Sequence, residues 1–335
     1  MNSNPKDNIL SVLVVGGAGF IGSHMVKMLG KKGLEVTTFD NLSTGHRDAV
    51  KCGEFFHGNL LDRANLSELF HKKKFDVVMH FASSINVGES VDKPAKYYKN
   101  NVVTTLNLLD VMREFNVKKF IFSSTAAIFG EPMYSPIDEL HPKNPINPYG
   151  KSKLMVEQIL QDYDHAYGLK SICLRYFNAA GASPEGDLAE RHEPETHLIP
   201  LILRAASGRN KDISLFGQDY ATKDGTCVRD YIHVDDLCSA HFLAIEHLFE
   251  LNVSGSFNLG NGEGFSVKEV IESVEKITNT KLTVLNKPRR AGDPDKLIAN
   301  SELAKTTLKW EAKDSNLDRI ITDAWEVEKN FKRIQ

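Results

Sequence analysis

The segment GGAGFIG, residues 16–22, constrains the fold more than any other part of this sequence. It follows the short apolar run LSVLVV (10–15) and precedes SHMVKMLGKK (23–32), in which apolar residues recur at helical spacing. A strand, a glycine-rich turn and a helix in this order are typical of dinucleotide-binding units. The glycines let the backbone approach a pyrophosphate, and the N-terminus of the helix offers it free N–H groups.

Two further features of this region bear on the cofactor. The glycines satisfy both G-x-G-x-x-G and G-x-x-G-x-x-G spacing, through Gly16, Gly17, Gly19 and Gly22. Asp40 closes the next predicted strand, EVTTFD (35–40), at about the ~20-residue distance expected of an acid that binds the adenosine ribose. A carboxylate there would repel a 2′-phosphate, so NAD is favoured over NADP, although Arg47 slightly weakens that preference. The alternative is a tight turn followed by a helix with an acidic N-cap.

The first half of the chain alternates short apolar strands with helical segments. Strands are predicted at 54–58, 76–82, 118–124 and 171–177, and helices at 61–73, entered through Asp62, at about 95–115 and from Tyr149 onward. Continuous apolar strands of this kind suit a sheet that is buried on both faces. The sequence therefore predicts an α/β fold with a doubly wound parallel sheet.

The regular alternation of predicted strands and helices ends at about Ala179. A polar stretch, GASPEGDLAERHEPETH (181–197), is too long for a simple connection and indicates a functional loop or a domain crossing. Shorter mixed elements follow: helices at 198–207, 234–249 and 264–277, the last with a capping box of Ser266 and Glu269, and strands near 213 and 228. We expect a dinucleotide-binding domain over 1–178 and a smaller α/β substrate-binding lobe over 179–335, with some segments of the second part returning to the first domain.

Composition excludes several classes of partner. The 335 residues are 41% hydrophobic and 25% charged, with a net charge of -3, so no basic field points to nucleic acid or an anionic membrane. The four cysteines form no C-x-x-C pair, so neither a zinc site nor a disulfide framework is predicted, and no metal is expected. Without a signal-type segment or an apolar stretch of ~18 residues, we expect a cytoplasmic protein.

A tyrosine and a lysine lie one helical turn apart in NPYGKSKLMVEQIL (147–160). Helix geometry places Tyr149 and Lys153 on one face, and a nearby ammonium favours the phenolate. Such a phenol can take the proton of a sugar or alcohol hydroxyl while hydride passes to NAD. Y-x-x-x-K alone is often a surface pair, but the upstream glycine turn and FSST (122–125) favour catalysis. Thr125, or failing it Ser124, offers a hydroxyl at the carboxyl end of that strand.

Together these stretches resemble the extended short-chain dehydrogenase/reductase family, and within it the UDP-glucose 4-epimerases. The resemblance rests on an ordered set of motifs from the first strand to about residue 300: GGAGFIGSH, FDNLSTGHR, HFAS with VGES, FSSTAAIFGE, PYGKSKLMVEQIL, RYFNAAGA, DGTCVRDYIHVDDL and PRRAGDP. It implies a homodimeric isomerase of carbohydrate metabolism that acts on UDP-hexoses and holds NAD tightly. We expect the dimer to form through the helices near 95–115 and 149–167.

The resemblance also implies a mechanism. Hydride leaves C4 of the hexose for NAD, the bound 4-keto sugar turns its other face, and the hydride returns, which inverts C4. Tyr149 would act as the base, Lys153 would bind the nicotinamide ribose and lower the tyrosine pKa, and Thr125 would bridge the sugar O4.

Family positions imply the remaining site residues. The cofactor would be lined by Gly16, Gly19, Phe20, Ile21, Gly22, Asp40, Asn41, Leu42, Ser43, Thr44, Gly45, Asn59, Leu60, Phe81, Ala82, Ser83, Asn100, Thr125, Tyr149, Lys153 and Phe177. The nucleotide sugar would be held by Thr125, Tyr149, Asn178, His197, Leu198, Ser214, Leu215, Phe216, Arg229, Arg290, Asp293 and Leu297. Two guanidinium groups suit a diphosphate, and the carboxylate can accept from ribose hydroxyls.

The chain departs from the family pattern at four positions, and a fifth bears on substrate choice. Ile85 stands where lysine is familiar, Asn59 where an acid is usual near adenine, His197 where asparagine is common, and Thr125 where serine is. Leu297 occupies the position that limits room beside the C2 substituent of the sugar, so acceptance of UDP-N-acetylhexosamines is open.

Other functions remain as alternatives. A nucleotide-sugar dehydratase needs an acid pair directly after the threonine, where this chain has Ala126 and Ala127. A dehydrogenase that releases NADH, another nucleotide-sugar 4-epimerase acting on UDP-N-acetylglucosamine or UDP-glucuronate, and a non-catalytic NAD-binding regulator share the fold. Arg229 could also serve only to pair with Asp230 or Asp235.

Overall fold

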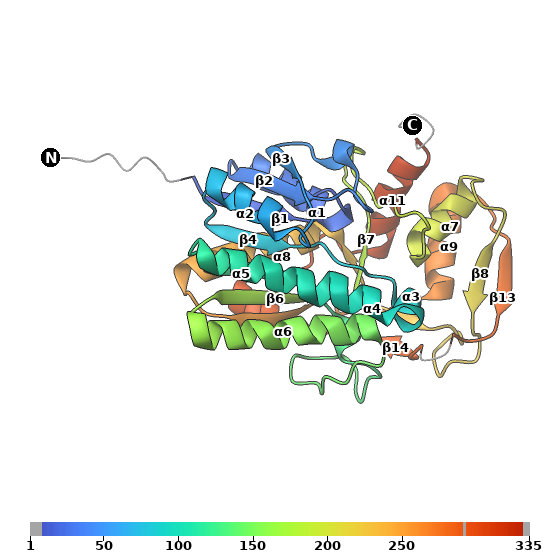
Figure 1. The fold of residues 1–335 in the computed structure, drawn as a ribbon. Helices are drawn as coiled ribbons and strands as arrows, with labels where there is room; N and C mark the ends of the chain where they lie inside the picture. Colours follow the sequence, from blue (N-terminus) through green and yellow to red (C-terminus); the bar gives the residue numbers. More distant parts are fainter. Residues whose placement is uncertain (1–8, 291–292, 331–335) are drawn as a thin grey trace.

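The computed structural model describes residues 9–290 and 293–330, and its centre is a seven-stranded parallel sheet (Figure 1). The strand order is β11-β6-β5-β4-β1-β2-β3, and every neighbouring pair is parallel. The strands are β1 (Ser11–Val15), β2 (Glu35–Asp40), β3 (Glu54–His57), β4 (Val77–His80), β5 (Lys119–Thr125), β6 (Lys170–Tyr176) and β11 (Gly255–Leu259). The predicted doubly wound α/β fold is confirmed.

Alternating side chains of the strands fill two separate cores. Val12 and Val14 of β1 pack into the core formed with α1 (Phe20–Lys31), α8 (Val234–Glu250) and α10 (Glu302–Leu308). Leu13 and Val15 point to the opposite face, which is covered by α2 (Arg63–Lys72), α5 (Thr104–Glu114) and α6 (Pro148–Tyr167). Burial of both faces explains why these strands are apolar throughout instead of alternating with polar residues.

Two parts of the sheet domain differ from the sequence prediction. The single helix expected over about 95–115 is α4 (Pro94–Tyr97), a π-helical segment (Tyr98–Val103) and α5 in succession, preceded by α3 (Val87–Asp92). The edge strand β11 was not predicted. It lies almost eighty residues after β6 in the sequence and pairs with it over its whole length.

A smaller lobe lies beyond one end of the sheet (Figure 1). Helices α7 (Leu198–Ala206), α9 (Val267–Thr278) and α11 (Leu317–Glu328) share one core with β8 (Ile213–Phe216), which pairs with β13 (Val284–Lys287).

Short strands join this lobe to the sheet domain. The pairs are β7 (Asn178–Ala180) with β10 (Tyr231–His233), and β9 (Val228–Arg229) with both β12 (Phe265–Ser266) and β14 (Lys296–Leu297). The domain boundary after residue 178 stays a prediction. The structure adds that α8 and β11, which follow that point in the sequence, pack within the sheet domain.

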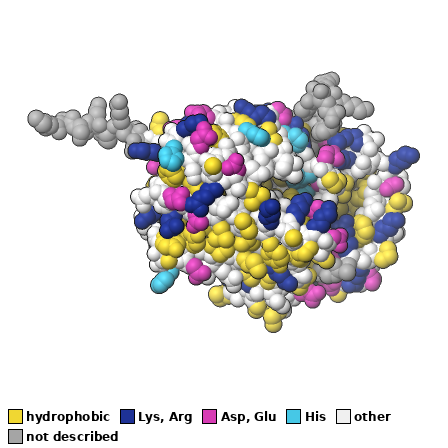
Figure 2. Space-filling model, in the orientation of Figure 1, with side chains coloured by type: hydrophobic (Ala, Val, Ile, Leu, Met, Phe, Trp, Pro, Cys, Tyr) yellow, Lys and Arg dark blue, Asp and Glu magenta, His cyan; other side chains and the backbone are white. Residues whose placement is uncertain are grey.

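The surface over α5 and α6 is apolar. Figure 2 shows a band of hydrophobic side chains across this face, and Val91, Val103 and Met155 are among the exposed apolar residues of α3 to α6. Among the described helices, none combines the length and the apolar character needed to cross a membrane.

Replacement of Ser266 by alanine should destabilise the small lobe. The Ser266 hydroxyl accepts from the Glu269 N–H at 3.1 Å, and the Glu269 carboxylate accepts from the Ser266 N–H at 2.8 Å, so the predicted capping box is present. We expect Ser266→Ala to lower the free energy of unfolding by about 1–2 kcal/mol in urea titrations. Ser266→Thr keeps the hydroxyl and should stay within about 0.5 kcal/mol of the parent. Equal losses in the two variants would contradict the capping role.

Candidate functional site

A cavity of about 1630 Å³ lies between the carboxyl ends of the central strands and the small lobe. It is lined by every cofactor and substrate residue predicted from the sequence except Leu215. The lining starts at the residues that follow β1, β2, β4, β5 and β6 and continues onto α7, β8 and β9 of the small lobe. A crevice at the carboxyl ends of parallel strands is the usual ligand site of this architecture.

The glycine turn at the cavity floor is too tightly packed for side chains. Gly16 has φ +81°, and a Cβ there would lie 2.4 Å from the Ala82 nitrogen. A Cβ on Gly22 would lie 2.2 Å from the Gly16 carbonyl oxygen. In the described chain no side chain caps α1, whose N-cap is Gly19, so the amides of the first turn are open toward the cavity. This arrangement fits a dinucleotide pyrophosphate.

The Asp40 side chain stabilises the glycine turn and the loop that follows β2, which line the cavity together. Its carboxylate accepts from the Ala18 N–H at 3.0 Å and from the Leu42 N–H at 2.8 Å. Each carboxylate oxygen keeps a further lone pair for a ribose hydroxyl. The Arg47 guanidinium lies 4.4 Å from the centre of the Phe55 ring and is not among the described residues that line the cavity, so it does not offset this negative charge.

Tyr149 lies in the first turn of α6, as predicted. The Asn147 side chain accepts from the Gly150 N–H at 2.8 Å and so caps the helix directly before Pro148. Lys153, one turn further, is almost completely buried, and its Nζ donates to the Ser123 carbonyl at 2.7 Å. The same Nζ lies 6.0 Å from the centre of the Tyr149 ring, so both groups face the cavity at the end of β5.

Desolvation dominates the charges of this pair. Burial raises the pKa of Tyr149, and a hydrogen bond with the Thr125 side chain partly opposes that rise. Burial also lowers the pKa of Lys153 to about 7, although the Glu157 carboxylate acts in the other direction. Burial therefore shifts both groups toward their uncharged forms, and a positive charge beside the pair would favour the phenolate that a base requires.

A buried ion pair decides which hydroxyl at the end of β5 is available. Glu157 accepts two hydrogen bonds from Arg175, at 2.8 and 3.0 Å, and one from the Ser124 hydroxyl at 2.6 Å. Ser124 is therefore engaged within the core. The Thr125 side chain accepts from the Ala127 N–H at 3.1 Å and lies beside Tyr149, which favours Thr125 over its neighbour as the ligand for a substrate oxygen.

The opposite wall of the cavity carries the cations. Arg229 pairs with Asp293 and donates to the Val228 carbonyl at 2.7 Å, whereas the Arg290 guanidinium lies 4.0 Å from the centre of the Phe216 ring.

Asp230 points away from Arg229. Its carboxylate accepts from the backbone N–H groups of Asn261, Gly262 and Ala299, and burial raises its pKa to about 7. The alternative in which Arg229 only pairs with Asp230 is therefore not what the structure shows.

Leu215 is the one predicted residue that does not reach the cavity. Successive side chains of β8 point to opposite sides, so Ser214 and Phe216 line the cavity while Leu215 is buried in the core of the small lobe. Its predicted place among the substrate residues stays a prediction.

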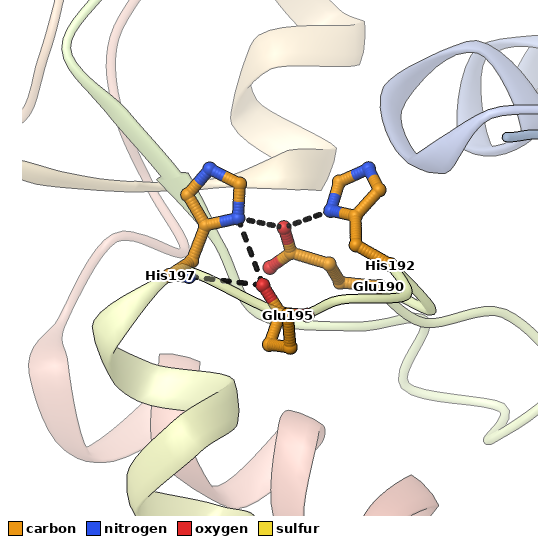
Figure 3. Close-up of side chains that lie close together, drawn as sticks. All are labelled: Glu190, His192, Glu195 and His197. Atoms are coloured by element: carbon orange, nitrogen blue, oxygen red, sulfur yellow. Dashed lines mark hydrogen bonds and ion pairs between the residues drawn. The ribbon is translucent and has the colours of Figure 1, made fainter. Parts of the chain in front are cut away.

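The sequence prediction missed a cluster of titratable side chains in the 181–197 loop. Glu190, His192, Glu195 and His197 lie together at the cavity margin (Figure 3), and their ligand atoms are within 4.8 Å of one another, so they could hold a metal ion. The signal in the sequence was the pattern E-x-H-x-x-E-x-H, in which only His197 had been singled out.

Comparison with known proteins assigns the chain to a family. Residues 12–260 match the NAD dependent epimerase/dehydratase family over most of the sheet domain. The chain belongs to this family. It is also 51% identical over 316 residues to the UDP-glucose 4-epimerase of Halalkalibacterium halodurans, which covers 94% of this chain and 95% of that protein.

Solved structures of UDP-glucose 4-epimerases agree with this epimerase/dehydratase fold. The enzyme of Brucella ovis in complex with NAD superposes with a TM-score of 0.94 at 49% identity, over 96% of this chain and 98% of that one. The enzyme of Bifidobacterium longum in complex with NAD+ and UDP gives a TM-score of 0.90 at 39% identity, over 97% and 99% of the two chains. The resemblance inferred from the motifs is confirmed.

Gly16→Ala and Gly33→Ala form a matched pair that isolates the packing of the glycine turn. Both glycines have positive φ, +81° and +77°, but no atom lies within 4 Å of a Cβ on Gly33. We expect Gly33→Ala to cost roughly 1–2 kcal/mol through backbone strain alone. Gly16→Ala should cost about 1–3 kcal/mol more, because its Cβ collides with Ala82. Urea titration of the two variants measures the difference, and equal costs would show that the turn tolerates a side chain.

Proposed function

We propose that this protein interconverts UDP-glucose and UDP-galactose by inversion at C4, with NAD as its cofactor. One observation carries the proposal: Tyr149, Lys153 and Thr125 meet in the cavity that also contains the glycine turn and, on its far wall, Arg229 and Arg290. A dinucleotide and a nucleotide diphosphate sugar can thus approach one reacting centre. The relatives reported above, which are named UDP-glucose 4-epimerases, support the same reaction.

Each residue of the reacting centre has one task. Tyr149 takes the proton of the C4 hydroxyl and returns it after the sugar has turned, and Thr125 holds the same oxygen. Lys153 uses one N–H on the Ser123 carbonyl, which leaves two donors for ribose hydroxyls and places its charge near the phenol. NAD held by the glycine turn, Asp40 and Lys153 would supply the hydride acceptor and donor for C4 and a positive charge that favours the phenolate.

The nucleotide end of the substrate meets the small lobe. Arg229 and Arg290 neutralise the diphosphate, and Asp293 accepts from ribose hydroxyls. Phe216, with the Arg290 guanidinium on its ring, offers an aromatic face to the uracil. The Leu297 side chain is half-buried and lines the cavity, at the position that limits room beside the C2 substituent of the sugar. Chromatography of the products formed from UDP-N-acetylgalactosamine tests whether N-acetylated substrates are accepted.

Residues next to Thr125 disfavour elimination chemistry. Ala126 is buried and Ala127 half-buried, and neither carries an acid or a base that could remove water from the sugar. A regulator that only senses NAD would not need a buried lysine beside a tyrosine at the cavity.

The protein works as a homodimer in the cytoplasm on this proposal. The exposed apolar band over α5 and α6 suits a subunit interface, and size-exclusion chromatography with light scattering measures the assembly. The four cysteines are free, as expected in a reducing compartment.

Tyr149→Phe should abolish turnover while it preserves cofactor binding. Loss of the base should lower kcat for UDP-galactose by about 10²–10⁴-fold, with the NAD content of the purified protein unchanged. Tyr163→Phe is the control, because Tyr163 lies on the same helix and its hydroxyl donates to Asp110 away from the cavity. A fully active Tyr149→Phe variant would refute the assignment of the base.

Asp40→Asn should weaken the preference for NAD over NADP. Removal of the carboxylate charge removes its repulsion of a 2′-phosphate, so the ratio of the two affinities should fall by about tenfold in titrations of cofactor-depleted protein. Asp48→Asn, a change of an exposed acid paired with Arg191, should shift the ratio by less than about twofold. An unchanged ratio in Asp40→Asn would contradict its role at the ribose.

A further inference from the structure

The cluster at the cavity margin is organised around His197. Its Nδ1 lies 2.7 Å from Glu190 Oε1 and 3.1 Å from Glu195 Oε1, and His192 approaches the same Glu190 oxygen at 2.9 Å (Figure 3). The two carboxylates are almost fully removed from water, with side chains 6% and 0% exposed, whereas the His197 side chain is 43% exposed. The acids are therefore inside, and the imidazole lies between them and the cavity.

These contacts have the geometry of hydrogen bonds. In a tetrahedral zinc site, nitrogen and oxygen ligands at 2.0–2.1 Å from the metal lie about 3.3 Å from each other. Both Nδ1 atoms are closer than that to Glu190 Oε1. Glu195 Oε1 also accepts from the Thr196 and His197 N–H groups, at 2.8 and 2.9 Å, so this oxygen is already engaged by N–H donors, whereas Glu195 Oε2 has no hydrogen-bond partner among the described residues. The cluster therefore fits a proton better than a metal ion.

A proton on His197 balances the charges of the cluster. Burial lowers the pKa of His197, but hydrogen bonds to Glu190 and Glu195 outweigh it and raise the pKa to about 10. Burial raises the pKa of Glu190, but hydrogen bonds from His192 and His197 hold it at about 2. Arg204 of α7 lies 3.9 Å from Glu195 Oε2 and offsets the second carboxylate.

The free side of the imidazole faces the cavity. Figure 3 shows Nδ1 turned toward the two carboxylates and Nε2 on the opposite side of the ring, where the described residues give it no hydrogen-bond partner. His197 is the N-cap of α7, so the open amides of a helix N-terminus lie beside it. Other charged residues that line the cavity include Arg191 and Glu193 of the same loop, Asp212, and, on the opposite wall, Arg229, Asp293 and Arg290.

We propose that Glu190 and Glu195 are positioning residues that keep His197 as an imidazolium, whose Nε2–H donates to the diphosphate of the nucleotide sugar. This inference rests on the proposed function, since it assigns the ligand of one group within that site. Arg229 is half neutralised by Asp293, so the His197 charge completes the positive wall that a doubly charged diphosphate requires. The carboxylates also orient the ring, so that the second nitrogen can only point outward.

The test is the pH dependence of UDP-glucose binding to the NAD-loaded protein. The diphosphate diester of UDP-glucose does not titrate between about pH 6 and pH 8.5, whereas a histidine without its carboxylates does. Lys153 and Asp230 have pKa values of about 7 and titrate in this window in every variant, so the change in wild-type affinity between the two pH values, measured by calorimetry, is the reference. His197 adds nothing to that change because it stays charged below its raised pKa. In Glu190→Gln the pKa falls, so the affinity should be near that of the wild type at about pH 6 and about tenfold weaker at about pH 8.5.

Two more variants separate charge from structure. His197→Asn keeps a favourable helix N-cap and should bind about tenfold more weakly at both pH values, with the loss in KM and not in kcat. Glu185→Gln removes an exposed carboxylate of the same loop that pairs with Lys27 and Lys31 and is not among the described residues that line the cavity, so it should match the wild type. Glu190→Gln that tracks the wild type at both pH values, or His197→Asn with full affinity, would overturn the inference.

Two other outcomes have distinct meanings. Stoichiometric zinc in the purified wild-type protein, lost in Glu190→Gln, would overturn the inference in favour of a metal site. Failure of the wild type to bind UDP-glucose at either pH would overturn the proposed function itself, and the inference with it.

Discussion

The close approach of the Gly16 and Ala82 backbones is the constraint on which the rest of the site depends. These residues follow the neighbouring strands β1 and β4, and the chain leaves β1 for a helix on one face and β4 for helices on the other. The two connections diverge at this point, which opens the crevice at the carboxyl ends of the strands. A side chain at Gly16 would push the strand ends apart and displace the open amides of α1.

Desolvation is the second physical factor in this site. The protein buries its titratable groups, which disfavours their charged forms, and hydrogen bonds or opposite charges offset that effect more fully at some groups than at others. Lys153 is almost fully buried, and Glu157, the Ser123 carbonyl and the Phe122 ring, whose centre lies 4.8 Å from Nζ, partly offset its loss of water. Tyr149 likewise keeps its proton in the protein alone. Burial thus shifts both groups toward their uncharged forms, and a positive charge that arrives with the cofactor would favour the phenolate. At the cavity margin the balance is reversed, since two buried acids stabilise the charge of His197.

The sequence predicted the parts of the fold that local patterns encode. The glycine turn, the strands of the first half, the Asp62 cap and the Ser266 capping box depend on neighbouring residues and are all present. Pairing of β11 with β6 joins segments more than eighty residues apart, which no local pattern reports.

The candidate site likewise combines features that local sequence predicts with features that only the folded chain reveals. Ser124 and Thr125 looked equivalent in sequence, and only the buried Glu157 and Arg175 pair distinguishes them. The Leu215 side chain packs into the core of the small lobe because successive side chains of β8 alternate, and this much the strand pattern could have predicted. The Glu190 and Glu195 contacts with His197 depend on how a long loop folds back on itself, and spacing alone could not give them.

The central claim is that a hydride leaves C4 of the sugar and returns to the same carbon within one bound complex. The most direct test uses UDP-galactose that carries deuterium at C4, with mass spectrometry of the UDP-glucose formed in ordinary water. The account predicts full retention of deuterium in the product. Exchange of the label with solvent hydrogen would contradict it, because the C4 hydrogen would then leave as a proton.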